Sequence, residues 1–218
     1  MENKKLLPYQ SFHSRIASKP DTAILNELAS QSMVEGIPLT PLKVACLLFT
    51  LARKISPRNI IEIGTGFGYS CLLLALASKE SNITTIEYNS MYVDIAQKFF
   101  KRFKSHCPIR VIKDNALNAI RTLNGTFDFV FLDAAKEEYV DYIKLLLPHL
   151  SEGAMIIADD VFFNGERLGK VLHAVEKEKI TSMLWEFRQY LEKEPYFLTS
   201  FFPIDCGVSV TLLIHPHS

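Results

Sequence analysis

The sequence lacks several features that would assign it to common classes of protein. Its 218 residues carry 24 basic and 24 acidic side chains, so no net charge draws it toward nucleic acid or a membrane surface. No apolar run approaches the length of a transmembrane helix, and the first residues lack the apolar run of a secretion signal. The four cysteines form no Cys-x-x-Cys pair, which favours free thiols and a reduced, cytoplasmic setting.

The sequence also has no internal repeat, no low-complexity tract and no linker rich in Gly, Pro or Ser. Its composition, 48% hydrophobic and 22% charged, is typical of a folded globular protein rather than a disordered one. A chain of this length can fill one domain around a single core, so we expect one domain over residues 1–218. Within it we expect N-terminal helices (1–57), a central core (58–160) and an insert with a terminal hairpin (161–218).

The first third of the chain predicts helices. Asp21 is expected to cap a helix that runs to about Val34, because Asp is a favourable N-cap residue and apolar residues follow at helical spacing. Thr40 is expected to cap a second helix that has Pro41 in its first turn.

From residue 59 onward, short apolar runs alternate with longer amphipathic segments. The expected strands are 59–63, 82–87, 109–113, 127–133 and 154–160, and the expected helices are 69–79, 91–105, 116–123, 137–149 and 167–193. Strands that are apolar on both faces and alternate with helices predict an α/β fold with a doubly wound, mostly parallel, Rossmann-like sheet. Two further runs, 195–202 and 207–214, predict an antiparallel C-terminal hairpin that brings the sheet to seven strands.

A glycine-rich segment, 61–70, lies between the first expected strand and the helix that follows. Glycines there permit a tight turn and a close approach of a ligand to the backbone. Glu87 ends the next strand, 23 positions after Gly64, where a carboxylate can accept hydrogen bonds from ribose hydroxyls. The alternative is a plain glycine turn with a solvated glutamate. The whole pattern favours a nucleotide site.

These features fit either a dinucleotide dehydrogenase or a methyltransferase. Glu62 lies within the glycine motif, where a carboxylate would repel a pyrophosphate but tolerate a cationic sulfonium ligand. The terminal antiparallel hairpin also differs from the all-parallel second half of a dinucleotide fold. Both observations favour the methyltransferase.

Three carboxylates follow two neighbouring strands of the expected sheet. Asp133 ends the fourth strand, and Asp159 and Asp160 end the fifth. Ligands of open α/β sheets bind at the carboxyl ends of strands, and acids that converge there repel one another unless a cation lies between them. Oxygen ligands of this kind suit Mg²⁺, Mn²⁺ or Ca²⁺. The alternative is that some of these acids cap helices.

Lys136 follows Asp133 by three positions and is expected in the first turn of the next helix, where the helix dipole disfavours a cation. We expect a nearby metal ion and burial to lower the pKa of Lys136, which suits a general base. The alternative is a solvated surface lysine.

Taken together, these residues resemble the catechol and caffeoyl-coenzyme A O-methyltransferase family, a cation-dependent family that uses S-adenosylmethionine. The resemblance extends from about Met33 to Leu213. Its most specific parts are the Asp-Ala-x-Lys-x-x-Tyr block from Asp133 and the later pair of aspartates. The further matching segments are 35–41, 61–70, 85–88, 127–139, 156–165 and 203–208.

The resemblance implies a role for each matching residue. The S-adenosylmethionine site would comprise Leu39, Thr40, Tyr69 and Ser70 at the methionine end, Glu62, Gly64 and Gly66 beneath the turn, Glu87 on the ribose, Tyr88 along the adenine, Asn115 and Ala116 at the adenine edge, and Asp133. The metal ligands would be Asp133, Asp159 and Asp160. Lys136 would be the base, and the catalytic pair would be Lys136 and Asp133. The resemblance also implies a homodimer.

This chain departs from the family at three positions. Asp160 stands where the family usually has Asn, which makes the metal site more negative and should reduce the Lewis acidity of the ion. Asp114 stands where the family usually has Gly, so we expect it to adopt a backbone conformation that glycine usually supplies. Cys206 interrupts the usual Asp-Gly before the last strand.

The expected reaction is methyl transfer from S-adenosylmethionine to a metal-coordinated hydroxyl of an acceptor, which we expect to be a catechol-like small molecule. Phe162, Phe163, Trp185 and Phe187 are candidates for an aromatic wall around this acceptor, with core or dimer packing as the alternative. A macromolecular acceptor, such as a hydroxylated tRNA base or a protein side chain, remains an alternative, and a NAD-dependent oxidoreductase is a remote one.

Overall fold

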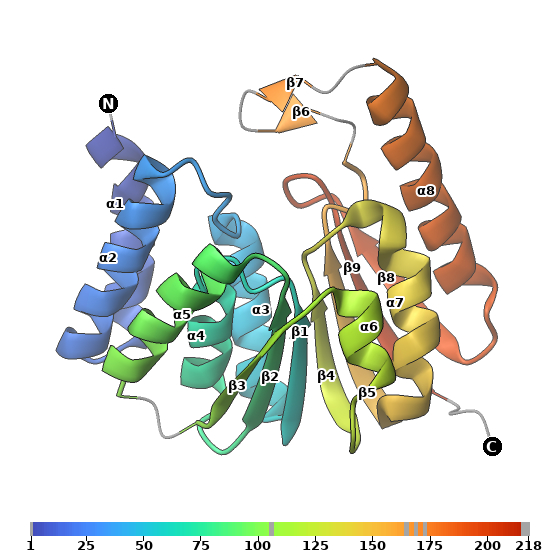
Figure 1. The fold of residues 1–218 in the computed structure, drawn as a ribbon, viewed down its shortest axis with the longest axis horizontal. Coiled ribbons are helices and arrows are strands. Elements are labelled where there is room, and N and C mark those ends of the chain that lie inside the picture. Colours follow the sequence, from blue (N-terminus) through green and yellow to red (C-terminus); the bar gives the residue numbers. More distant parts are fainter. Residues whose placement is uncertain (1, 105–106, 164–165, 168–169, 172–173, 215–218) are drawn as a thin grey trace.

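The computed structural model describes residues 2–104, 107–163, 166–167, 170–171 and 174–214. Its central element is a seven-stranded sheet in the order β3-β2-β1-β4-β5-β9-β8 (Figure 1). The strands are β1 (Asn59–Ile63), β2 (Asn82–Glu87), β3 (Ile109–Lys113), β4 (Phe127–Leu132), β5 (Leu150–Asp159), β8 (Phe197–Phe202) and β9 (Val208–Leu213).

The pairing of these strands confirms the predicted sheet. β3, β2, β1, β4 and β5 pair in parallel, whereas β9 runs antiparallel to both β5 and β8. The C-terminal hairpin therefore completes the sheet at the β5 side. β5 begins at Leu150, four residues before the predicted start, and its register against β4 shifts between Phe127 and Phe129.

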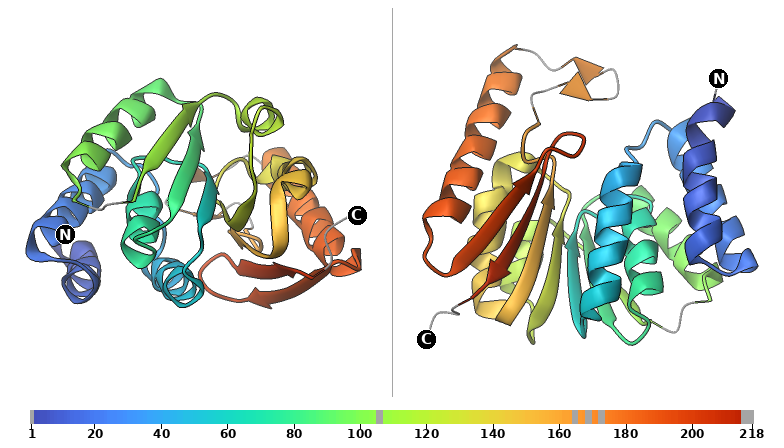
Figure 2. Two further views of the ribbon diagram at one scale, coloured as in Figure 1. Left: turned by 90° about the horizontal axis from the view of Figure 1, so that it is seen from below. Right: turned by 180° about the vertical axis from the view of Figure 1, so that it is seen from behind.

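Helices cover both faces of the sheet, as Figure 2 shows in two further views. Ile61 and Ile63 of β1 point to the face that packs against the later helices, and Ile60 points to the opposite face. This alternation explains why the strand is apolar throughout. The helices are α3 (Leu42–Ile55), α4 (Tyr69–Ala77) and α5 (Ser90–Arg102) on one side, and α6 (Ala116–Arg121), α7 (Tyr139–Leu146) and α8 (Ala174–Lys193) on the other.

Two N-terminal helices, α1 (Glu2–Ile16) and α2 (Lys19–Val34), lie outside α4 and α5. α1 is absent from the sequence-based prediction. The predicted cap of α2 is wrong, because the helix begins at Lys19 with Ser18 as its N-cap and Pro20 in its first turn. Asp21 lies inside that turn and accepts a hydrogen bond from the Ser18 hydroxyl at 2.6 Å.

The predicted start of α3 differs from the observed one by one residue. The N-cap position is Pro41, which offers no side-chain acceptor, and Thr40 makes no capping hydrogen bond. Between β4 and α7 the chain forms a short 3-10 helix, Lys136–Glu138, and a second one, Leu147–His149, follows α7.

The predicted helix 167–193 is too long at its start. Within the described residues, Glu166–Arg167 (β6) pairs antiparallel with Lys170–Val171 (β7), and α8 begins at Ala174. The sequence places Gly169, a poor helix former, between these two strands. Residues 168–169 and 172–173 of the predicted helix, and residue 105 of another, lie outside the described residues. None of the helices in the described ranges is long and apolar enough to cross a membrane.

Candidate active site

A cavity of about 720 Å³ opens at the carboxyl ends of the parallel strands. It lies where the strand order reverses, between β1 and β4, which is the place where open α/β sheets bind ligands. One wall comes from the segment between β1 and α4, and the opposite wall comes from the segments that follow β4 and β5.

The glycine segment forms a turn that Glu87 holds in place. Gly64 continues the hydrogen bonding of β1 to β2, because its backbone N–H donates to the carbonyl of Ile86 at 3.0 Å. The carboxylate of Glu87 accepts from the backbone N–H of Gly66 at 3.0 Å and from that of Asn89 at 2.9 Å. Glu87 therefore orders the turn and lines the cavity at the same time.

The cavity brings together nearly all the residues predicted to bind the cofactor. Asn115 caps α6, and its side chain accepts from the backbone N–H of Leu117 at 2.9 Å. The predicted cofactor residues that line the cavity are Leu39, Thr40, Gly64, Gly66, Tyr69, Ser70, Glu87, Tyr88, Asn115, Ala116 and Asp133.

Glu62 is the exception, because it is fully buried beneath the turn and does not line the cavity. The Thr85 hydroxyl donates to its Oε2 at 2.6 Å, and the Ser70 hydroxyl also lies near its carboxylate. Burial raises the pKa of Glu62 to about 7, although both hydroxyls act in the opposite direction. Glu62 therefore supports the turn from below.

The expected strain at Asp114 is not observed. Among the described non-glycine residues, only Ser56, Asp160 and Asp205 have a positive φ. Asp114 fits because its backbone N–H donates to the carbonyl of Glu87 at 3.2 Å and its side chain accepts from the backbone N–H of Asn115 at 2.7 Å. This position does not require glycine.

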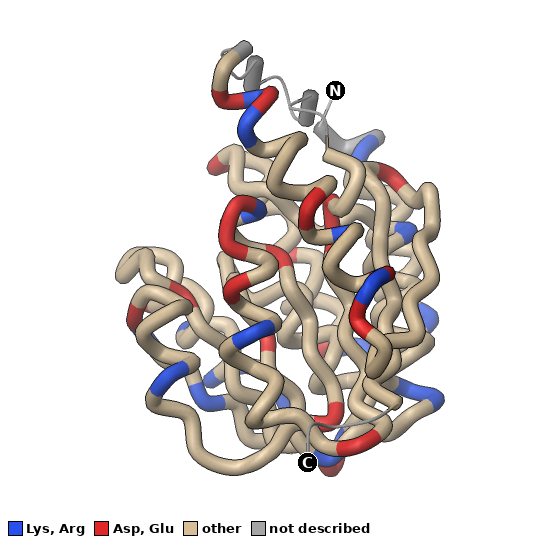
Figure 3. The backbone as a smooth tube through the Cα atoms, turned by 90° about the vertical axis from the view of Figure 1, so that its right-hand side faces the viewer, with Lys and Arg blue, Asp and Glu red and all other residues tan. Residues whose placement is uncertain are grey.

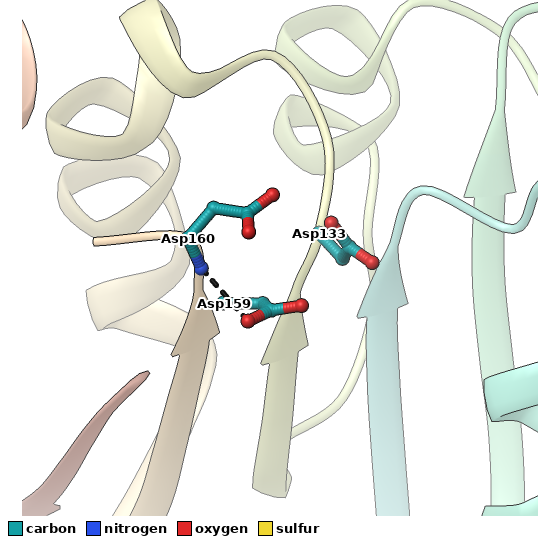
Figure 4. Close-up of side chains that lie close together, drawn as sticks. All are labelled: Asp133, Asp159 and Asp160. Carbon is teal, nitrogen blue, oxygen red and sulfur yellow. Dashed lines mark hydrogen bonds between the residues drawn. The ribbon is translucent and has the colours of Figure 1, made fainter. Parts of the chain in front are cut away.

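The three predicted acids converge on the other side of the cavity (Figure 4). Asp133 directly follows β4, Asp159 is the last residue of β5, and Asp160 follows it with a φ of 61°. One carboxylate oxygen from each lies within 4.8 Å of the other two. Asp160 donates its backbone N–H to Oδ1 of Asp159 at 2.8 Å, which fixes the Asp159 carboxylate against the backbone of Asp160.

This donor set fits a hard divalent cation. Asp159 is fully buried, Asp160 is nearly so, and the Asp133 side chain is one-quarter exposed toward the cavity. Three converging carboxylates with little access to water repel one another, and an ion with oxygen ligands would relieve that repulsion. Lys136 provides part of the compensating charge in this structure.

Lys136 reaches into the acidic cluster. Its Nζ lies 2.9 Å from Asp133 Oδ1, 3.2 Å from Asp160 Oδ2 and 2.9 Å from the hydroxyl of Tyr139. Burial alone would lower the pKa of Lys136, but the carboxylates of Asp133, Asp160 and Asp159 and the Tyr139 hydroxyl raise it well above its ordinary value. The lowering of this pKa beside a bound cation stays a prediction.

Tyr139 is a site residue to which the sequence analysis assigned no role. It is fully buried, and burial raises the pKa of its hydroxyl. The hydroxyl accepts from Lys136 and lies 3.2 Å from the carbonyl of Leu132 and 3.1 Å from that of Asp159. Tyr139 thus ties Lys136 to the ends of β4 and β5. The sequence signal that could have identified Tyr139 is its position three residues after Lys136.

Only one of the four candidates for an aromatic wall lines the cavity, and that one is Phe163. Phe187 is fully buried against Tyr139, with ring centroids 5.2 Å apart, and belongs to the core. Phe162 lies over Gly207, and Trp185 is exposed on α8. Further lining residues that the sequence analysis did not single out include Ile37, Phe67, Tyr92, Glu138, Tyr142 and Ile180.

Comparisons with known proteins extend over almost the whole chain. A sequence profile of a family described as O-methyltransferase matches residues 16–214. A catechol O-methyltransferase from Niastella koreensis is 30% identical over 176 residues, which cover 77% of this chain and 79% of the relative. The matched region takes in both the glycine turn and the acidic cluster.

Solved structures share the fold. A Staphylococcus aureus protein, provisionally described as a caffeoyl-CoA O-methyltransferase, has a TM-score of 0.79 at 26% identity and covers 97% of this chain and 99% of its own. The SAH-bound methyltransferase PaMTH1 of Podospora anserina has a TM-score of 0.76 at 24% identity, over 91% of this chain and 89% of its own.

Proposed function

The chain belongs to the S-adenosylmethionine-dependent O-methyltransferase family, and we propose that it methylates a hydroxyl oxygen of a small, catechol-like acceptor held by a divalent cation. Family membership excludes the oxidoreductase alternative. One observation carries the finer proposal. Asp133, Asp160 and Lys136 line the same cavity as the predicted cofactor residues, and Asp159 is buried next to them, with a carboxylate oxygen within 4.8 Å of those of Asp133 and Asp160.

Asp133, Asp159 and Asp160 are the residues that would hold the cation. A divalent ion, when bound there, supplies positive charge that polarises the acceptor hydroxyl and offsets the three carboxylates. The additional charge of Asp160 favours binding of the ion and reduces its Lewis acidity.

Lys136 is the group that would take the proton from the acceptor hydroxyl, at Nζ. With the carboxylates offset, burial is the main remaining effect on its pKa, and burial favours the neutral amine. The acceptor oxygen then forms its bond to the methyl carbon as the bond between that carbon and sulfur breaks, and the electron pair of that bond stays on sulfur. Tyr139 holds Lys136 in position throughout, and the two cavity walls align the reacting groups.

The acceptor side of the cavity suits a small molecule with an apolar ring. Phe163, Tyr142 and Ile180 line it beside Lys136 and Asp160. On the side of the molecule that faces the viewer in Figure 3, Lys and Arg are interspersed with Asp and Glu along the chain. The homodimer and the cytoplasmic location stay predictions.

The test is methyl transfer by the purified protein from tritium-labelled S-adenosylmethionine to a panel of small catechols, bulk tRNA and cell protein. We expect label in catechols only, loss of transfer after stripping with EDTA, and recovery with Mg²⁺ or Mn²⁺. Full transfer by the stripped enzyme would contradict the metal role. Label in tRNA or protein alone would contradict the small-molecule acceptor.

The base is tested separately, with Lys136→Ala. We expect a loss of about 10²–10⁴-fold in rate, the usual contribution of general acid–base catalysis. Lys144→Ala, an exposed lysine on α7, is the matched control and should retain full activity. A loss of less than about tenfold for Lys136→Ala would exclude Lys136 as the base.

A further inference from the structure

A buried histidine outside the cavity connects three helices. His13 lies on α1 and is fully buried. Its Nδ1 lies 2.6 Å from the side-chain carbonyl oxygen of Asn26 on α2, and its Nε2 lies 2.8 Å from the hydroxyl of Tyr69 on α4. Both ring nitrogens therefore have partners, and the two partners come from different helices.

These partners define the protonation state of the ring. The Asn26 oxygen can only accept, so Nδ1 of His13 carries the proton and donates it. Nε2 then has a lone pair, which accepts the hydrogen bond from the Tyr69 hydroxyl. Burial lowers the pKa of His13, and this favours the neutral ring that the arrangement needs. The rings of Tyr9 and Phe12 of α1 also lie near that of His13, with centroids 6.3 and 6.0 Å away.

Tyr69 is where this network meets the cavity. It is the first residue of α4, directly after the glycine turn, and it lines the cavity together with Ser70. Its hydroxyl is engaged by His13, which does not itself line the cavity. A change at His13 can therefore reach a bound ligand only through its neighbours.

α1 holds a second part of the same wall. The Tyr9 hydroxyl donates to the backbone carbonyl of Thr40 at 3.1 Å, and Thr40 lines the cavity. The Tyr9 ring also packs edge-on against that of Tyr69, with centroids 6.0 Å apart. One turn of α1 thus contacts both the segment before α3 and the start of α4.

We propose that His13 is a positioning residue for the cofactor, and that it orders the cavity wall by accepting the hydrogen bond of the Tyr69 hydroxyl. This inference rests on the proposed function, because it takes the cavity to be the S-adenosylmethionine site. A fixed Tyr69 fixes the start of α4 and the glycine turn before it. A wall that is already ordered loses less conformational entropy when the cofactor binds, so the cofactor binds more tightly.

The test is the affinity for S-adenosylhomocysteine, measured by isothermal titration calorimetry at pH 8. His13→Phe fills the same space but leaves the Tyr69 hydroxyl and the Asn26 oxygen without their partner. We expect its Kd to rise about tenfold, which corresponds to ~1.4 kcal/mol, the order expected for a buried group that loses its partner. Tyr69→Phe should also weaken binding, and the double variant should be no worse than His13→Phe alone, because that variant has already lost the hydrogen bond between His13 and Tyr69.

Two further variants separate positioning from general loosening. Ser78→Ala removes a buried hydroxyl that donates to the Pro57 carbonyl at 3.1 Å, at the opposite end of α4 from Tyr69. It should lower the thermal midpoint as His13→Phe does, yet keep the Kd within twofold of the wild type. His13→Gln, which can still donate and accept, should recover part of the affinity that His13→Phe loses.

The outcomes are distinct. A folded His13→Phe that binds as tightly as the wild type overturns the inference alone, as does a Ser78→Ala that weakens binding equally. If His13→Phe does not fold, a Tyr69→Phe that binds as tightly as the wild type overturns it. A wild type that does not bind S-adenosylhomocysteine overturns the proposed function, and this inference with it.

Discussion

A methyl group added at Gly64 would meet the main chain of the residue that begins the acidic cluster. Gly64 has a φ of +100°, and a Cβ placed on it would lie 2.2 Å from the carbonyl oxygen of Asp133 and 2.9 Å from its carbonyl carbon. The backbone N–H of Asp133 donates to the carbonyl of Ile63 at 3.0 Å, so the clash falls where β1 and β4 are held together. Gly64→Ala must therefore move β1 and β4 apart or distort one of them.

The expected cost has two parts. A non-glycine residue with a positive φ loses roughly 1–2 kcal/mol. Forcing extra volume into a well-packed place costs typically another 1–3 kcal/mol, and a clash with backbone belongs at the upper end of that range. Gly125→Ala is the matched control, since Gly125 has a φ of +90° and nothing lies within 4 Å of a Cβ there. It should show the first cost only.

The assay is urea unfolding of the wild type and both variants. We expect Gly64→Ala to lose about 2–5 kcal/mol of unfolding free energy and Gly125→Ala about 1–2 kcal/mol, with unchanged m-values. Gly64→Ala should also weaken binding of S-adenosylhomocysteine and of Mn²⁺, because the clash displaces Asp133. If the two variants lost the same unfolding free energy within about 0.5 kcal/mol, the close approach of Gly64 to the carbonyl of Asp133 would not be what requires glycine there.

Two more predictions concern buried groups. Burial raises the pKa of Glu62 to about 7 from an ordinary 4.5, so between these values the folded protein keeps a proton that the unfolded chain releases. The contribution of Glu62 to the free energy of unfolding is therefore greatest at low pH and is lost as pH rises through 7. The stability of the wild type relative to Glu62→Gln, measured by urea unfolding, should fall by about 2–3 kcal/mol from pH 5 to pH 8. No change over this range would contradict a buried, protonated Glu62. Tyr139→Phe removes the hydroxyl that holds Lys136, so kcat should fall at least about tenfold. The Kd for S-adenosylhomocysteine should stay unchanged, because Tyr139 does not line the cavity. An unchanged kcat would exclude the positioning role of Tyr139.

Much of the sheet could be predicted because its strands are short, apolar on both faces and separated by clear turns. β1, β2 and β3 begin and end at the predicted residues. The N-terminal helix, α1, was missed because few of its residues are buried. Among those whose burial is described, the buried ones are Leu6 and His13, and the second is polar. A polar side chain buried by tertiary contacts leaves no periodic signal in the sequence.

The site could be predicted where its residues follow strand ends, because topology alone brings those ends together. Asp133, Asp159 and Asp160 converge for this reason. The electrostatic environment of Lys136 could not be predicted, since it depends on distances of about 3 Å to groups on three segments. The contact between His13 and Tyr69 could not be predicted either, because the two residues are 56 positions apart and lie on different helices.

The contact between Gly64 and Asp133 also explains how one site can align two reactants. Gly64 belongs to the turn under the predicted cofactor, and Asp133 belongs to the predicted metal site, yet their backbones are close enough to exclude a Cβ. The backbone bond from Asp133 to Ile63 joins the same two strands. The spacing between the glycine turn and the backbone of Asp133 is therefore set by paired strands, which in the proposed reaction would fix the two reactants relative to each other. Methyl transfer needs such rigidity, because displacement of a reacting atom by about 1 Å can cost about 10²-fold in rate.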